Sequence, residues 1–247
     1  EFARRRLKRH LQVHYRHYGM NGFVLKCDIK DYFGSTPHEV AKSAIDKRVD
    51  DEWAKLQVGK IIDSFDHKDK PGRGIGLGSQ VSQLIQLSVL DDIDHYIKEK
   101  LHIKTYVRYM DDFILIHEDK EYLKSIRTFI AEYLNGIKLR LNEKKTQIFK
   151  LSQPIKYLGF SFEITSSGKV VKRLLQDNLK RQKKKLNGLF RRLEAGKLTM
   201  KDVETCYASW KAHSSKGNTH NLILKMDQYF NERRNKYYGI TSNKNKS

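Results

Sequence analysis

Apolar residues flank a pair of acidic residues near the middle of the chain. Tyr106-Val107 precedes the pair, and Phe113-Ile114-Leu115-Ile116 follows it. Runs of this length that are rich in β-branched and aromatic residues are typical of strands. The pattern therefore predicts a β-hairpin with Asp111 and Asp112 at its tip.

Other elements follow from the spacing of apolar residues. Residues 23–29 form a mostly apolar run and predict a strand with Asp28 near its C-terminal end. A second hairpin is expected, with arms over residues 157–164 and 169–171, and short strands are expected near Leu139, Leu141 and Ile148-Phe149. Apolar residues three or four positions apart predict helices over residues 3–18, 36–47, 52–65, 79–101, 120–135, 172–192, 201–213 and 218–238.

The composition divides the chain. A basic amphipathic helix lies in residues 1–22, and residues 23–171 predict a mixed α/β domain. Lysine and arginine become frequent near residue 172, so residues 172–240 predict a separate all-helical domain. The polar tail, residues 241–247, is expected to be disordered. No internal repeat is evident.

The charge of the chain indicates a polyanionic partner. Its 49 Lys and Arg residues outnumber 29 Asp and Glu residues, which gives a net charge of +20. The pI is about 9.8, so nucleic acid is the first candidate partner and a membrane surface the second. No apolar run approaches the roughly 18 residues of a spanning helix, and no signal peptide is visible. We therefore expect no membrane partner.

Composition also limits the class of protein. Hydrophobic residues make up 38% of the chain, too many for a disordered tail. Cys27 and Cys206 lack the spacing of metal ligands and predict a reduced, cytoplasmic protein. Position 1 is Glu rather than Met, so we expect a fragment of a longer protein.

The three acidic residues suggest a shared chemistry. Antiparallel packing of the strand that ends at Asp28 against the hairpin would gather Asp28, Asp111 and Asp112 at one sheet edge. Carboxylates held together need a cation, and magnesium prefers such oxygen ligands. The plainer alternatives are an Asp-Asp turn that only exposes polar side chains and a strand-end aspartate that caps a turn.

Five segments, in order, resemble the motifs of reverse transcriptases. Residues 28–33 (Asp-Ile-Lys-Asp-Tyr-Phe) are similar to motif A and residues 109–112 (Tyr-Met-Asp-Asp) to motif C. Residues 78–83, after a glycine-rich loop over residues 70–78, resemble motif B. Residues 139–146 resemble motif D, residues 157–160 resemble motif E, and the basic helices after them resemble a thumb.

This resemblance implies a fold and an activity. The fold is α+β, a right-hand polymerase palm with an antiparallel sheet packed on helices, followed by an all-helical thumb and with the fingers largely absent. Because most of the fingers subdomain of the family is missing, we expect either a truncated chain or an atypical lineage. The implied activity is an RNA-directed DNA polymerase that extends a primer 3′-hydroxyl with deoxynucleoside triphosphates on an RNA template.

The resemblance also implies the catalytic residues. Asp28 and Asp111 match the direct ligands of two Mg²⁺ ions, for which Mn²⁺ can substitute, and Asp112 matches a supporting carboxylate. The carbonyl of Ile29 is expected on the metal that carries the triphosphate. Lys145, or its neighbour Lys144, matches a proton donor to the leaving pyrophosphate, the alternative being a solvated lysine in a turn.

Further positions match contacts with substrates. Phe33 matches an aromatic gate that excludes a 2′-hydroxyl, although an isolated phenylalanine is more often an ordinary core residue. The remaining candidates are the nucleotide-binding residues Leu77, Gly78, Ser82 and Gln83, the primer grip Tyr157, Leu158, Gly159 and Phe160, and the phosphate-binding residues Lys172, Arg173, Lys180 and Lys184.

Motif B departs from the commonest pattern of the family. Leu77 stands before the glycine and Gln83 follows the serine, where many members have Gln and Pro. This resembles diversity-generating retroelement reverse transcriptases, which copy RNA with errors and whose expected partner is a basic accessory protein. Retron, group II intron and abortive-infection types remain open, as do an RNA-synthesising polymerase of the same fold and a palm-fold nucleic-acid-binding protein without turnover.

Overall fold

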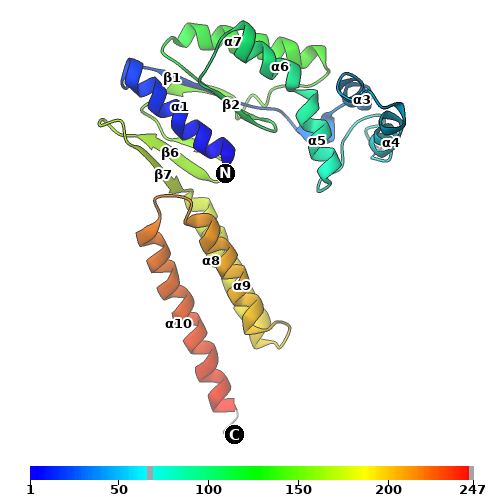
Figure 1. The fold of residues 1–247 in the computed structure, drawn as a ribbon. Coiled ribbons are helices and arrows are strands. Elements are labelled where there is room, and N and C mark those ends of the chain that lie inside the picture. Colours follow the sequence, from blue (N-terminus) through cyan, green and yellow to red (C-terminus); the bar gives the residue numbers. More distant parts are fainter. Residues whose placement is uncertain (66–68, 245–247) are drawn as a thin grey trace. The chain divides into compact units, whose positions relative to one another are not determined.

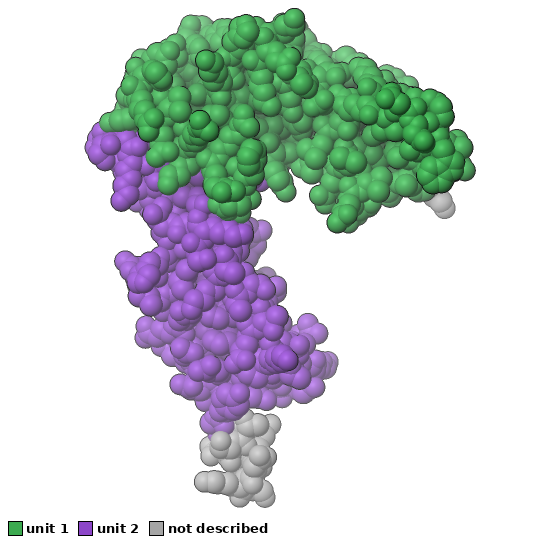
Figure 2. All heavy atoms as spheres, viewed as in Figure 1, with its two compact units in different colours: residues 1–153 green, residues 154–247 purple. Residues whose placement is uncertain are grey.

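The computed structural model describes residues 1–65 and 69–244. The chain divides into two compact units, residues 1–153 and residues 154–247 (Figure 2). The expected boundary near residue 172 therefore lies inside the second unit. The division comes earlier because the three-stranded sheet at residues 155–174, which includes the predicted hairpin, belongs to the unit that contains the C-terminal helices.

A four-stranded antiparallel sheet forms the centre of the first unit. Its strands are β1 (Phe23–Asp28), β2 (Tyr106–Tyr109), β3 (Asp112–His117) and β4 (Gln147–Lys150). Their spatial order is β2-β3-β1-β4. The predicted first strand and central hairpin are confirmed.

Helices surround this sheet (Figure 1). The first unit contains α1 (Phe2–Tyr18), α2 (Tyr32–Ser35), α3 (His38–Asp46), α4 (Glu52–Asp63), α5 (Gln80–Val89), α6 (Asp91–His95), a π-helical turn (Tyr96–Lys100) and α7 (Lys120–Gly136). The single helix expected over residues 79–101 is interrupted at Leu90, whose backbone leaves the helical region at φ −106° and ψ 11°. The helix expected over 52–65 ends at Asp63, and residues 66–68 lie outside the described residues.

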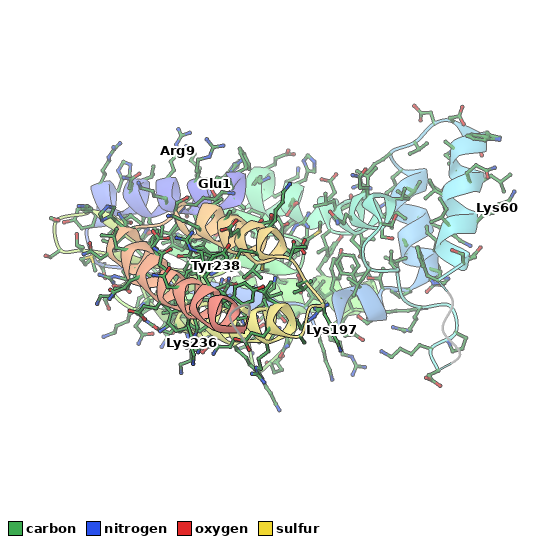
Figure 3. The ribbon with its side chains drawn as sticks, turned by 90° about the horizontal axis from the view of Figure 1, so that it is seen from below. Glu1, Arg9, Lys60, Lys197, Lys236 and Tyr238 are labelled. Atoms are coloured by element: carbon green, nitrogen blue, oxygen red, sulfur yellow. The ribbon has the colours of Figure 1, made fainter. Side chains whose placement is uncertain are left out.

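The two faces of the sheet pack against different helices. Leu25 and Cys27 of β1 point into a core that contains Ile93 of α6 and Ile130 of α7. Alternation along the strand places Val24, Lys26 and Asp28 on the opposite face. Helix α1 contacts β2 and β3, and its Leu7 and Leu11 are fully buried. Its charged side is exposed, and Arg9 projects outward (Figure 3).

The second unit pairs a small sheet with long helices. Strands β5 (Ile155–Tyr157), β6 (Phe160–Ile164) and β7 (Val170–Leu174) form an antiparallel sheet in that order. Helices α8 (Gln176–Glu194), α9 (Met200–Ser214) and α10 (His220–Lys244) follow. Within the described residues, no helix of either unit combines the length and apolarity needed to cross a membrane.

Three expectations for the second unit were wrong. The hairpin arm expected over residues 157–164 is broken by a turn at Leu158-Gly159, where φ is 45° at Leu158 and 85° at Gly159. Lys172 and Arg173 lie in β7 rather than in a helix, because their segment pairs with β6. The tail expected to be disordered is helical as far as Lys244, and residues 245–247 lie outside the described residues.

Candidate active site at the end of the central sheet

Two of the candidate carboxylates are direct neighbours across the sheet. Asp28, the last residue of β1, pairs with Asp112, the first residue of β3. Asp111 precedes Asp112 in the hairpin turn, and its carbonyl accepts a hydrogen bond of 3.2 Å from the amide of Ile29. Met110 adopts φ 55°, a left-handed conformation that tightens this turn. The fold thus brings together the three acidic residues that the sequence singled out.

Each of the paired carboxylates contacts a lysine. The ammonium of Lys145 lies 3.0 Å from Oδ2 of Asp28, and that of Lys26 lies 3.3 Å from Oδ2 of Asp112. The other carboxylate oxygen, Oδ1, is buried in both aspartates and has no hydrogen-bond partner among the described residues. A buried carboxylate oxygen without a partner is costly, so both sites favour an added cation or donor.

The electrostatics of the site reflect this crowding. Burial raises the pKa of Asp112 to about 6, with Lys26 opposing the rise and Asp111 and Asp28 adding to it. Burial also raises the pKa of Asp111, and the charge of Asp28 contributes in the same direction. The pKa of Lys145 is raised by its hydrogen bond to Asp28. The three carboxylates therefore repel one another and are balanced by two lysines.

The donor set suits a hard divalent cation, although the side chains are not in a ligating arrangement. Across residues 1–65 and 69–244, no three His, Cys, Asp or Glu side chains are gathered closely enough to hold a metal ion. Carboxylate oxygens are the ligands that Mg²⁺ prefers, and the unpartnered Oδ1 atoms of Asp28 and Asp112 are free to serve. Asp28 and Asp111 would hold such an ion once Lys145 moved away from Oδ2.

A buried ion pair that the sequence did not reveal supports the hairpin. The guanidinium of Arg108 in β2 donates to both carboxylate oxygens of Asp94 in α6, at 2.8 Å and 2.5 Å. It also donates to the carbonyl of Met110 at 3.0 Å. The only signal in the sequence was an arginine inside an otherwise apolar and aromatic strand. Lys26, a polar residue within β1, gave a similar signal.

The nucleotide candidates occupy varied environments. Phe33 is half-buried and packs against the core, with its ring edge-on to Tyr32 at 5.9 Å. Leu77 is 81% exposed, and Gly78 adopts φ 97° with open space around it. Gln83 is exposed, but Ser82 is fully buried, and its hydroxyl has no hydrogen-bond partner among the described residues. In this conformation Ser82 cannot reach a nucleotide.

The remaining candidates lie in the second unit and stay predictions. Tyr157 and Phe160 are buried, so the turn between them presents mainly the backbone of Leu158-Gly159. The ammonium of Lys172 lies 5.1 Å from the centre of the Phe160 ring, a cation–π contact. Three further candidates are exposed: Arg173, which pairs with Glu163, and Lys180 and Lys184 on α8.

Solved structures share this architecture. The apo telomerase of Candida tropicalis matches with a TM-score of 0.53 and 17% identity, over 70% of this chain and 35% of that chain. The telomerase of Candida albicans, solved with a TWJ fragment of telomeric RNA, matches with a TM-score of 0.53 and 14% identity, over 68% and 34%. At these identities the likeness shows the fold alone. The chain has a palm-like polymerase fold, as expected.

Sequence comparison identifies the family. The family model described as reverse transcriptase (RNA-dependent DNA polymerase) matches residues 3–162. Because this match covers more than half of the chain, the protein belongs to the reverse transcriptase family.

Two curated relatives match parts of the chain. The group II intron-encoded protein LtrA of Lactococcus lactis subsp. cremoris is 39% identical over 85 residues, which are 30% of this chain and 14% of that protein. Protein YkfC of Escherichia coli (strain K12) is 24% identical over 177 residues, 56% of this chain and 46% of that protein. The chain thus spans less than half the length of either relative.

Proposed function

We propose that the protein is an RNA-directed DNA polymerase that extends a primer on an RNA template with deoxynucleoside triphosphates. The observation that carries this proposal is the pairing of Asp28 with Asp112 across β1 and β3, with Asp111 in the adjoining turn. Membership of the reverse transcriptase family supports the same reaction. We further propose that Mg²⁺ is the divalent metal.

The residues of the site have separate tasks in this reaction. Bound Mg²⁺ would lower the pKa of the attacking 3′-hydroxyl and neutralise charge on the phosphates. Asp28 and Asp111 would hold the metal, while Asp112, paired with Lys26, fixes the end of β3. The ammonium of Lys145 is exposed and adjoins Asp28. We propose that it gives a proton to the departing pyrophosphate.

A primer-extension assay tests the activity. Asp111→Asn keeps the size of the side chain but removes its charge, so we expect extension to fall at least about a hundredfold while RNA binding persists. Asp119→Asn is a matched control, because Asp119 caps helix α7 away from the carboxylates. Normal extension by Asp111→Asn would refute the proposal. Loss of RNA binding together with extension would show a folding defect, which circular dichroism would detect.

We propose a diversity-generating retroelement as the source, from the Leu77 and Ser82-Gln83 pattern of motif B. A basic accessory protein is then the expected partner. The likeness to LtrA favours a second candidate, a group II intron reverse transcriptase. Sequencing the products distinguishes them, since frequent errors opposite template adenines favour the first and faithful copying favours the second.

A further inference from the structure

A buried glutamine of helix α5 is connected to the segment that carries Phe33. Gln86 is fully buried, and its side-chain nitrogen Nε2 lies 3.0 Å from the equally buried hydroxyl of Thr36. That hydroxyl donates its single proton to the carbonyl of Tyr32 at 2.7 Å, so Gln86 is the donor to Thr36. The carbonyl belongs to the peptide bond between Tyr32 and Phe33. Gln86 therefore reaches the backbone of Phe33 through one intervening side chain.

A second bond joins the same two elements at a greater distance from Phe33. The hydroxyl of Tyr32 donates to the main-chain carbonyl of Gln86 at 2.6 Å. Helix α5 ends soon afterwards, at Val89, and the last carbonyls of a helix lack partners within it. This bond holds the far end of the Tyr32 ring to α5 and does not involve the peptide that leads to Phe33.

The glycine-rich loop holds the other side of Phe33. The amide of Ile75 donates to the carbonyl of Phe33 at 2.7 Å, and the amide of Gly74 donates to the carbonyl of Thr36 at 2.9 Å. Gly74 adopts φ 99°, a conformation that favours glycine. Because this loop leads directly into α5, the peptides on both sides of Phe33 are bonded to neighbouring parts of the chain.

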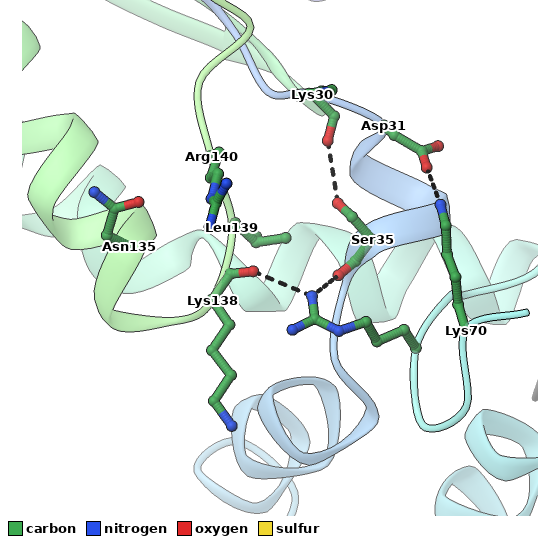
Figure 4. A pocket seen from close by; sticks show the side chains of 9 residues that line it. Lys30, Asp31, Ser35, Lys70, Asn135, Lys138, Leu139 and Arg140 are labelled. Carbon is green, nitrogen blue, oxygen red and sulfur yellow. Dashed lines mark hydrogen bonds and ion pairs between the residues drawn. The ribbon is translucent and has the colours of Figure 1, made fainter.

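The exposed side of helix α2 has weaker contacts (Figure 4). The ammonium of Lys70 donates to Asp31 at 2.8 Å, and the hydroxyl of Ser35 donates to the carbonyl of Lys30 at 3.1 Å. Exposed contacts of this kind hold two groups together only weakly. The buried side of α2 therefore carries more of the constraint on Phe33.

The chemistry of Gln86 indicates specificity more than stability. Burying an amide costs free energy unless its polar atoms form hydrogen bonds. Ile85 and Val89 of the same helix lie in the hydrophobic core, and an apolar residue in place of Gln86 would avoid that cost. A buried hydrogen-bonded pair fixes one arrangement of the elements that it joins, whereas apolar packing tolerates several.

We propose that Gln86 is a positioning residue for sugar selection, acting through Thr36 on the backbone of Phe33. This inference rests on the proposed polymerase function, with the Phe33 ring packed under the sugar of the nucleotide. Excluding one oxygen atom requires the ring to be held to within about 0.5 Å. If the ring can move aside, a ribonucleotide fits, while a deoxynucleotide fits in either case. Gln86 therefore affects the choice of sugar more than the rate with deoxynucleotides.

Incorporation of a single ribo- or deoxynucleotide by the full chain tests the proposal. Gln86→Met keeps the length of the side chain but removes the donor. We expect kcat/KM for the ribonucleotide, relative to that for the deoxynucleotide, to rise about five- to twentyfold, with the deoxynucleotide value within about threefold of the original. Thr36→Val should do the same, and Thr36→Ser, which keeps the hydroxyl, should retain the original ratio. A constant ratio in Gln86→Met and Thr36→Val would overturn the proposal.

Thr219→Val is the matched control for a general loss of stability. Thr219 is buried in the second unit, and its hydroxyl donates to the carbonyl of Ser214 at 2.6 Å. The substitution therefore removes the same kind of bond as Thr36→Val. It should lower resistance to urea while leaving the sugar ratio unchanged. A raised ratio in this control would overturn the proposal, because any loss of stability would then be sufficient.

A combined variant tests whether Gln86 acts through Phe33. If it does, adding Gln86→Met to Phe33→Val should change the sugar ratio by less than about twofold, because the ring is already gone. A further five- to twentyfold rise, about the effect of Gln86→Met alone, would overturn the proposal, since Gln86 would then act on a different group.

A binding measurement separates this inference from the proposed polymerase. A primer that ends in a dideoxynucleotide cannot be extended, so an added nucleotide only stabilises the complex of chain, primer and template. Stabilisation by a ribonucleotide relative to a deoxynucleotide should rise in Gln86→Met as incorporation does. A chain that discriminates sugars through Gln86 in this assay but never extends a primer would refute only the polymerase. Extension with the same sugar ratio before and after the substitution would refute only the role of Gln86.

Discussion

Arg108 and Asp94 form a bidentate ion pair beneath the hairpin that carries Asp111 and Asp112, with the guanidinium nitrogens 2.8 Å and 2.5 Å from the two carboxylate oxygens. The side chain of Arg108 is only 6% exposed. Its third contact, to the carbonyl of Met110, connects the pair to the turn that carries Asp111. Helix α6 thereby supports the turn that carries Asp111, a candidate metal ligand.

Asp94→Asn should therefore impair both stability and activity. The substitution leaves a buried arginine without its counter-charge, which typically costs about 3–5 kcal/mol. We expect the free energy of unfolding, measured with urea, to fall by about that amount. Primer extension should fall at least about tenfold at a temperature where the variant remains folded, because the hairpin tip loses its support.

The same helix supplies the control for this prediction. Asp91→Asn alters an ion pair with Arg48 in which the side chains are 42% and 25% exposed. Exposed pairs contribute less than about 1 kcal/mol, so this variant should unfold and extend primers almost normally. Equal loss of stability in the two variants would show that burial of the Arg108 pair does not explain the loss in Asp94→Asn.

Lys145 should compete with the metal for Asp28. Its ammonium lies 3.0 Å from Oδ2 of Asp28, but the lysine side chain is 62% exposed, so the pair is weak. We expect Lys145→Ala to tighten magnesium binding about two- to fivefold, measured by isothermal titration, while lowering the rate of extension through loss of the proton donor. Lys144→Ala, a change at the neighbouring exposed residue, should leave magnesium affinity unchanged.

Much of the fold followed from local patterns. β1 and β3 are short, nearly continuous apolar runs that are buried on both faces of the sheet, and these runs made the strands and the hairpin predictable. The break at Leu90 was not predictable, since the apolar spacing continues across it and only the backbone angles change. The turn at Leu158-Gly159 was missed for a similar reason, because apolar residues flank it on both sides.

The candidate site was likewise predictable only in part. Asp28, Asp111 and Asp112 were predictable because each is an acid at the end of an apolar run. Partners such as Asp94 for Arg108 were not, because an ion pair between a helix and a strand leaves no spacing to recognise. The amide of Lys30 donates to the carbonyl of Arg140, and only the folded chain brings these two distant residues together.

Phe33 should control the choice between ribo- and deoxynucleotides. A ring packed under the sugar leaves no space for a 2′-hydroxyl, so Phe33→Val should raise ribonucleotide incorporation relative to deoxynucleotide by about ten- to a hundredfold. Single-nucleotide extension with each substrate measures this ratio. Tyr32→Phe is the control, since it alters the adjacent aromatic residue, whose hydroxyl bonds the carbonyl of Gln86. An unchanged ratio in Phe33→Val would show that Phe33 does not exclude the 2′-hydroxyl.

His10 should make the protein less stable in mild acid. Its imidazole lies on the buried side of α1 and hydrogen-bonds the carbonyl of Tyr106 at 3.0 Å. Burial, with a smaller contribution from the charge of Arg6, lowers its pKa from 6.5 to about 4. Between these two values the unfolded chain binds a proton that the folded chain does not, so the free energy of unfolding falls as the pH drops from 6.5 toward 4.

His10→Gln isolates this effect, because glutamine can still donate to Tyr106 but does not titrate. We expect the difference in unfolding free energy between the two proteins to change by about 2–3 kcal/mol between pH 7 and pH 4. Urea unfolding across this range measures it. The raised pKa of Asp112 acts with the opposite sign, but it is common to both proteins and cancels in the difference. A difference that does not vary with pH would show that His10 titrates normally in the folded state.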